Sequence, residues 1–204
     1  NDSITWSISW NAPFLSPSGY GSEAISMILG LRSFENNNNN GAENNKQRSW
    51  DVMIGLHGDA IDQSYASTLP SDLYEWMGEA YTKQMQQLVM VPLSGVTSQN
   101  EMVERKKRTI VICHSEPGAW SLSPDYEAMY ETTPCPPQTP HRNSHSSRHR
   151  SNSEYAALVG RTMFETDTLP HGWEKRLNQM NEVWVPTLHH KEIFKQGGVN
   201  VPIY

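Results

Sequence analysis

Acidic and hydroxyl side chains are concentrated in residues 160–187, GRTMFETDTLPHGWEKRLNQMNEVWVPT. Glu165 and Asp167 stand two residues apart directly after an apolar run, and Thr187 follows a second apolar run. Paired carboxylates serve as acid and nucleophile in glycosidases, but such couples normally come from separate elements. For Glu165 two interpretations therefore stay open, namely binding of a ligand hydroxyl group and a structural network with Arg161.

A histidine, His114, comes directly after the apolar run Thr109–Cys113. An imidazole at the end of a strand can donate a hydrogen bond to a hydroxyl or carbonyl group without acting as a base. The polar turn that follows contains Ser115 and Glu116, and Glu116 either contacts a ligand or braces the turn. The alternative for a lone histidine is a structural side chain whose hydrogen bonds are satisfied within the fold.

A second histidine, His57, ends the apolar run Trp50–Leu56, and Asp59 comes two residues later. We expect both at the same edge of a sheet as His114. A turn built by Gly58 and Asp59 explains this segment adequately.

The glycine-containing segment SPSGYGSEA supplies Gly19, Tyr20, Gly21 and Ser22. We expect it to be a loop between a first strand and a helix that opens at residues 22–24. Such loops direct backbone N–H groups and a helix dipole at anions, and glycine lets a ligand approach the backbone closely. The segment matches neither the dinucleotide-binding nor the P-loop pattern. An ordinary tight turn is the alternative.

Strands and helices alternate along the predicted chain. The predicted strands are residues 4–9, 50–56, 109–113, 160–164 and 182–186, with one more beginning at 199, and the predicted helices are residues 22–31, 72–89, 171–181 and 188–196, the last capped by Gly197 and Gly198. This alternation predicts an α/β fold with a doubly wound parallel sheet. Open sheets of this kind bind ligands at the carboxyl ends of their strands, which is where the residues above are expected.

Two segments are low in complexity. Residues 36–48 are rich in asparagine, and residues 136–153 are rich in Pro, Ser, His and Arg. Polar tracts of this kind bury too little apolar surface to offset the entropy of ordering them. We therefore predict two disordered insertions, and we favour disorder over a metal site for the regularly spaced His141, His145 and His149.

The composition argues against several classes of protein. Acidic residues outnumber basic ones 22 to 16, for a net charge of −6, which argues against a nucleic-acid surface. No apolar run approaches the ~20 residues of a transmembrane helix. Two cysteines do not make a disulfide framework, and we expect Cys113 to be a buried, inert thiol, which favours a reducing, cytoplasmic location. Because residue 1 is Asn rather than Met, the sequence leaves open whether an upstream targeting segment has been removed.

Three blocks, in order, carry a family resemblance: NAPFLSPSGYGSEA at residues 11–24, ICHSEPGAW at 112–120, and residues 160–187. Together they resemble the amino-terminal half of retaining GT-B-fold glycosyltransferases of the family-four type, also called glycosyltransferase group 1. Two departures stand in the third block. Thr168 occupies a position where arginine is usual, and Asn181 one where aspartate is usual.

The resemblance implies a Rossmann-like domain over residues 1–204 and a carboxy-terminal donor domain absent from this chain. It implies transfer of a sugar, with retention, from a nucleotide-sugar donor to a hydroxyl-bearing acceptor, without a metal or a further cofactor. His114 would face the transferred sugar, and Gly19–Ser22, with Glu23 as a further candidate, would lie near the donor diphosphate and the acceptor. The remaining expected substrate-binding residues are Glu116, Glu165, Asp167 and Thr187.

Two other classes of function are weighed against this one. A non-catalytic carbohydrate-binding or interaction module, from a truncated glycosyltransferase, is the main alternative. An α/β hydrolase ranks last, because the G-x-S-x-G nucleophile motif is missing. Under the glycosyltransferase hypothesis the isolated 204 residues have little or no activity of their own.

Overall fold

The computed structural model describes residues 6–39, 50–89, 108–120, 132–137 and 155–204. Most of both predicted insertions lies outside these ranges. Residues 36–39, however, belong to a helix, and residues 136–137 belong to a described segment. For the residues of both segments outside these ranges, disorder stays a prediction.

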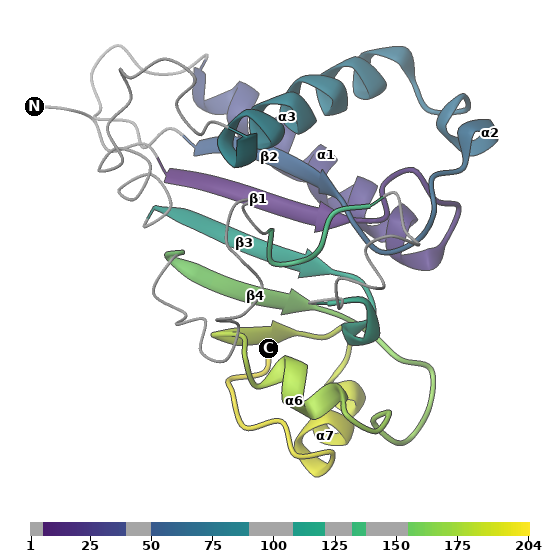
Figure 1. Ribbon diagram of the computed structural model, residues 1–204, viewed down its shortest axis with the longest axis vertical. Helices are drawn as coiled ribbons and strands as arrows, with labels where there is room; N and C mark the ends of the chain where they lie inside the picture. The colour runs from purple at the N-terminus through teal and green to yellow at the C-terminus, as the bar shows by residue number, and fades with distance from the viewer. Residues whose placement is uncertain (1–5, 40–49, 90–107, 121–131, 138–154) are drawn as a thin grey trace, which may run out of the picture.

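A five-stranded, entirely parallel sheet forms the centre of the molecule, in the order β2-β1-β3-β4-β5 (Figure 1). The predicted α/β class and Rossmann-like parallel sheet are confirmed. The strand predicted at 160–164 ends earlier, at Arg161, and the strand expected from residue 199 is a single bridge between Val183 and Ile203. The strands are β1 Trp6–Ala12, β2 Trp50–Leu56, β3 Thr109–His114, β4 Ala157–Arg161 and β5 Glu182–Trp184.

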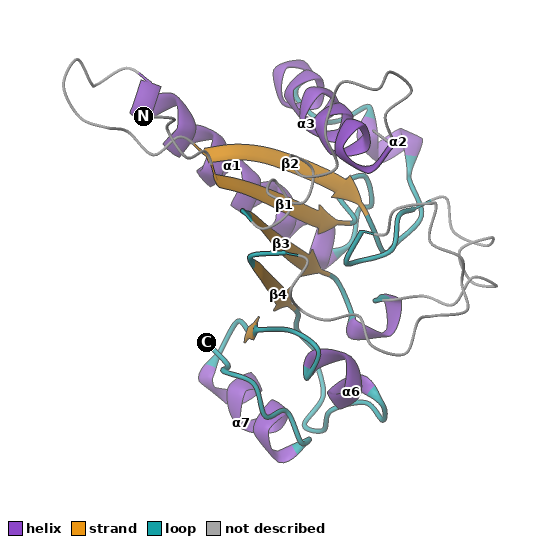
Figure 2. Cartoon of the chain, turned by 60° about the vertical axis from the view of Figure 1, so that its left-hand side comes forward, coloured by secondary structure: helices purple, strands orange, loops and turns teal. Residues whose placement is uncertain are grey.

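Helices connect and cover the strands (Figure 2). Helices α3 and α7 follow the bounds predicted at 72–89 and 188–196 closely. Helix α1 begins at Gly19, before the predicted start, and the helix predicted at 171–181 is the shorter α6. The described helices are α1 Gly19–Asn39, α2 Gln63–Ala66, α3 Ser71–Val89, α6 Trp173–Leu177, α7 Leu188–Gln196 and the 3₁₀ turn Pro117–Ala119.

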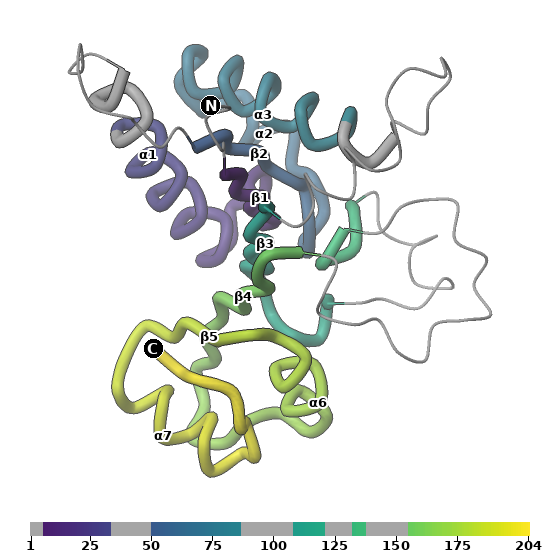
Figure 3. Tube along the Cα trace, turned by 90° about the vertical axis from the view of Figure 1, so that its left-hand side faces the viewer, coloured from purple at the N-terminus to yellow at the C-terminus, as the bar shows by residue number. Residues whose placement is uncertain are grey.

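Helices α1 and α3 lie on opposite sides of the strands (Figure 3). The strand register decides which side chains face α1. Trp10 pairs with Ile112, which lies two residues before His114 in β3 and therefore on the same face. His114 pairs in turn with Arg161, and Arg161 pairs with Trp184. Because paired residues of parallel strands share a face, these side chains lie on the α1 side.

A buried amide network fastens α3 to the other face of the sheet. Gln84 of α3 accepts from Ser9 Oγ at 2.7 Å and donates to Asn11 Oδ1 at 2.7 Å. Asn11 Nδ2 donates to Ser9 O at 3.1 Å. Gly55 of β2 leaves the space for this network, since a Cβ there would collide with the side chains of Asn11 and Gln84.

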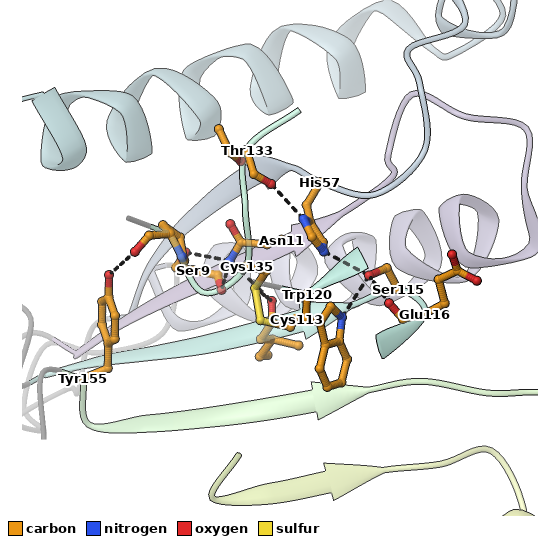
Figure 4. Close-up of a disulfide and its surroundings, with 12 residues drawn as sticks. Ser9, Asn11, His57, Cys113, Ser115, Glu116, Trp120, Thr133, Cys135 and Tyr155 are labelled. Atoms are coloured by element: carbon orange, nitrogen blue, oxygen red, sulfur yellow. Dashed lines mark hydrogen bonds between the residues drawn. A yellow bond between two sulfur atoms is a disulfide. The ribbon is translucent and has the colours of Figure 1, made fainter. Parts of the chain in front are cut away.

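Cys113 and Cys135 form a disulfide, with their Cα atoms 5.7 Å apart (Figure 4). The prediction that Cys113 is a free, inert thiol is therefore wrong. Disulfides persist in oxidising compartments and are rare in reducing ones, so the argument from the cysteines for a cytoplasmic location is lost. Within the described ranges, no helix is both long and apolar enough to cross a bilayer.

Candidate functional site

Three distant parts of the chain meet at the carboxyl ends of β3 and β4. His114 ends β3, Arg161 ends β4, and Glu23 lies in the second turn of α1. Glu23 Oε2 lies 2.8 Å from His114 Nε2, and Glu23 Oε1 pairs with Arg161 Nη2. A single carboxylate thus bridges an imidazole and a guanidinium.

The tautomer of His114 follows from its other neighbour, Trp10. The indole Nε1–H, which can only donate, lies 3.1 Å from His114 Nδ1. Nδ1 is therefore the acceptor, and Nε2 carries the proton that His114 donates to Glu23. Burial lowers the pKa of His114, against the opposing effect of Glu23, and this favours the neutral ring.

The Glu23 carboxylate is ionised and reaches solvent. The hydrogen bond from His114 lowers its pKa, Arg161 lowers it further, and partial burial opposes both. The side chain of Glu23 is 25% exposed, whereas that of His114 is 0% and that of Arg161 6% exposed. Within this cluster, Glu23 is the group that an external ligand reaches most directly.

Arg161 and Tyr20 hold the rest of the cluster in place. Arg161 Nη1 donates to Thr162 O at 3.1 Å and to Trp184 O at 3.3 Å. The Tyr20 hydroxyl donates to Met163 O and accepts from Met163 N at 3.2 Å. Burial raises the pKa of Tyr20. The first turn of α1 is thereby tied to the segment that leaves β4.

A second polar cluster lies around His57, on the side of the disulfide (Figure 4). His57 Nδ1 lies 2.7 Å from Thr133 O, a carbonyl that can only accept, so Nδ1 carries the proton. Ser115 then donates to Nε2 at 3.0 Å and accepts from Trp120 Nε1 at 2.9 Å. Burial lowers the pKa of His57 to about 4, so the ring is neutral at pH 7. Ser115 and His57 resemble a nucleophile–base pair, but both are buried.

The expected glycine loop is instead the first turn of α1. Gly19, Tyr20, Gly21 and Ser22 are all helical. A Cβ on Gly21 would lie 2.6 Å from Pro13 O and closer still to Ser16 O. The absence of a side chain at Gly21 is therefore required by the chain's own turn, and its contact with a ligand stays a prediction.

The other predicted substrate-binding residues are exposed. Of these, Glu116 lies near enough to Tyr20 for its charge to add to the effect of burial, which raises the pKa of Tyr20. Glu116, Glu165 and Asp167 are exposed in turns. Thr187 is the N-cap of α7, where its Oγ1 accepts from His190 N at 3.2 Å. The structural network proposed between Arg161 and the acids that follow it is wrong, because Arg161 pairs with Glu23.

His114 does not lie in an open cleft as expected. Its side chain is wholly buried and both ring nitrogens have partners inside the protein. Its predicted contact with a sugar stays a prediction. Across the described part of the chain, no group of three or more His, Cys, Asp or Glu residues is placed to hold a metal ion.

One feature of the sequence does indicate a buried ion pair in this cluster. Arg161 sits within the apolar run LVGRTMF at the end of a buried strand, and a buried arginine requires a partner. The partner is Glu23, 138 residues away, which sequence analysis gave only a minor place.

Fold and site together define an α/β protein with a Rossmann-like parallel sheet and a polar cluster at its carboxyl edge. Comparisons with models of protein families, with curated proteins and with solved structures found no match to this chain.

Proposed function

We propose that this chain is the acceptor-side half of a retaining glycosyltransferase that uses a nucleotide-sugar donor. One observation carries the proposal. Tyr20 and Glu23 come from the first block of resemblance, His114 from the second and Arg161 from the third, and they form one connected cluster. Residues that resemble a family in three separated blocks thus converge at the sheet edge where such folds bind ligands.

Glu23 is the residue that we assign to the acceptor. An ionised carboxylate accepts strong hydrogen bonds from hydroxyl groups, and this one is held in orientation by His114 and Arg161. Both ring nitrogens of His114 are in use, so we assign it the positioning of Glu23. Direct contact of His114 with the transferred sugar would require Trp10 or Glu23 to move.

The donor diphosphate is assigned to the amino terminus of α1. A helix amino terminus attracts anions through its dipole and its free N–H groups. Gly19 and Ser22, in the first turn of α1, are both exposed. A second, donor-binding domain outside these 204 residues would supply most contacts to the nucleotide, and neither a metal nor a further cofactor takes part.

The test is transfer from a panel of nucleotide sugars by a protein that contains this chain and its donor domain. Glu23→Gln is expected to lower kcat/KM about 10- to 100-fold, because it weakens a charge-assisted hydrogen bond. Asp51→Asn, at an exposed ion pair with Lys83, is the matched control and should leave turnover unchanged. Wild-type protein that turns over no donor would refute the proposal.

The non-catalytic carbohydrate-binding module remains a second candidate, for one reason. His114 is wholly buried and fully hydrogen bonded, as a structural histidine would be. Binding of glycans by the 204-residue chain, together with no donor turnover by the longer protein, would favour the module.

A further inference from the structure

A short segment, residues 132–137, crosses one face of the sheet, and we call it the strap. It runs from the carboxyl end of β2 to the amino end of β4 (Figure 4). Thr133 donates from both its N and its Oγ1 to Leu56 O, at 2.9 and 2.8 Å. At the other end, Tyr155 Oη donates to Pro137 O at 3.1 Å.

The disulfide joins the middle of the strap to the sheet. Cys135 belongs to the strap, and Cys113 is the residue before His114 in β3. Both cysteines are wholly buried. The other attachments of the strap include several hydrogen bonds, to Leu56, His57, Gly58 and Tyr155. The net contribution of each is small, because water replaces it when the strap leaves.

A chain of contacts leads from the strap to the carboxyl edge of the sheet. Thr133 O accepts from His57, His57 accepts from Ser115, and Ser115 accepts from Trp120. Trp120 packs so closely on Gly160 that a Cβ there would meet its ring at 2.5 Å. The position of the strap thereby bears on residues 115–120, the turn that follows His114.

We propose that the Cys113–Cys135 disulfide is a redox-sensitive latch that holds the strap and, through His57 and Ser115, orders the turn at residues 115–120. A dithiol reductant donates two electrons to the S–S bond. Each sulfur gains one electron and one proton, and the dithiol is oxidised to a disulfide. The inference does not depend on the proposed function.

Reduction is expected to loosen this region and leave the rest of the fold intact. Freed of the cross-link, the strap regains the conformational entropy that the disulfide restricted. The ladder pairing β3 with β1 and β4 makes no use of the S–S bond. Because both sulfurs are buried, a reductant reaches them only after local opening of the strap, so the rate of reduction reports that opening.

The test is hydrogen exchange of the 204-residue chain, with and without dithiothreitol, with alkylation to count free thiols. In the wild type, reduction should speed exchange at the amides of Thr133, His57 and Ser115 by a factor at least ten times larger than the factor for the amides of helix α7. The double variant Cys113→Ala/Cys135→Ala is the matched control. It should exchange rapidly at the same amides whether or not dithiothreitol is present.

Three results would overturn the latch. The first is two alkylated thiols with exchange unchanged at these amides. The second is a native protein from which dithiothreitol releases no thiol. The third is exchange that speeds up by the same factor at these amides and throughout α7, which would make the disulfide a general stabiliser of the fold with no particular hold on the strap.

Discussion

The Nε2 atom of His114 donates to the Glu23 carboxylate across 2.8 Å, although the two residues lie 91 positions apart in the chain. The opposite ring nitrogen accepts from Trp10, so the histidine is clamped in one neutral tautomer. Arg161 shares the carboxylate. The pair therefore places one ionised, partly exposed group at the sheet edge and anchors it from two sides.

Removal of the carboxylate should destabilise the fold strongly. Glu23→Ala leaves the buried Arg161 without its counter-charge, and breaking such a pair costs about 3 kcal/mol. The matched control is Asp51→Ala, whose exposed pair with Lys83 should contribute less than about 1 kcal/mol. Urea unfolding of both variants measures the difference, and equal losses would contradict the burial of the Glu23–Arg161 pair.

The free energy of unfolding should fall as the pH is lowered from 6.5 to about 4. Burial lowers the pKa of His57 from 6.5 to about 4 in the folded state. In this window the unfolded chain binds a proton that the folded chain does not, so the free energy of unfolding rises with pH by about 1.4 kcal/mol per unit. The contribution is fully present above pH 6.5 and is lost as the pH falls to about 4.

The variant His57→Gln tests that assignment. It removes the titrating group, so the slope of the unfolding free energy against pH should decrease by about 1.4 kcal/mol per pH unit, the contribution of one proton, over the same window. The lowered pKa values of His114 and Glu23 act in the same direction and remain in the variant. A slope that matches the wild type would show that His57 is not the group responsible.

Two glycine substitutions should have opposite effects. Gly55→Ala forces a methyl group into the side chains of Asn11 and Gln84, and overpacking of this kind costs about 1–3 kcal/mol. Gly78 lies exposed within α3, and a Cβ added there would meet no atom within 4 Å outside its own helix backbone, so Gly78→Ala should stabilise the protein by about 0.5–1 kcal/mol. Thermal unfolding compares them, and a neutral Gly55→Ala would mean that the amide network yields easily.

The disulfide should also contribute to global stability. It closes a loop with a sequence separation of 22 residues, and restriction of the unfolded chain by such a loop contributes about 3 kcal/mol. The Cys113→Ala/Cys135→Ala variant should therefore unfold at lower urea concentration while keeping its circular dichroism spectrum. An unchanged midpoint would indicate that the unfolded chain is not restricted by this cross-link.

Several elements could be predicted because their signals are local. The apolar run Trp50–Leu56 and the periodic pattern that became α3 lead directly to a strand and a helix. Helix α1 was expected to begin after Gly21, because two nearby glycines suggest a loop. The turn is helical since the carbonyls of Pro13 and Ser16 close onto Gly21, and this contact could not be read from the residues alone.

The sequence by itself determined the alternation of strands and helices, and hence a parallel sheet with polar residues at its carboxyl edge, because hydrophobic periodicity and glycine placement act over a few residues. Only the tertiary structure decided the partners. Glu23 meets Arg161, and Cys113 meets Cys135, because the order and register of the strands bring distant segments together. Such pairings depend on how the whole sheet packs, and this packing cannot be inferred from any short stretch of the sequence.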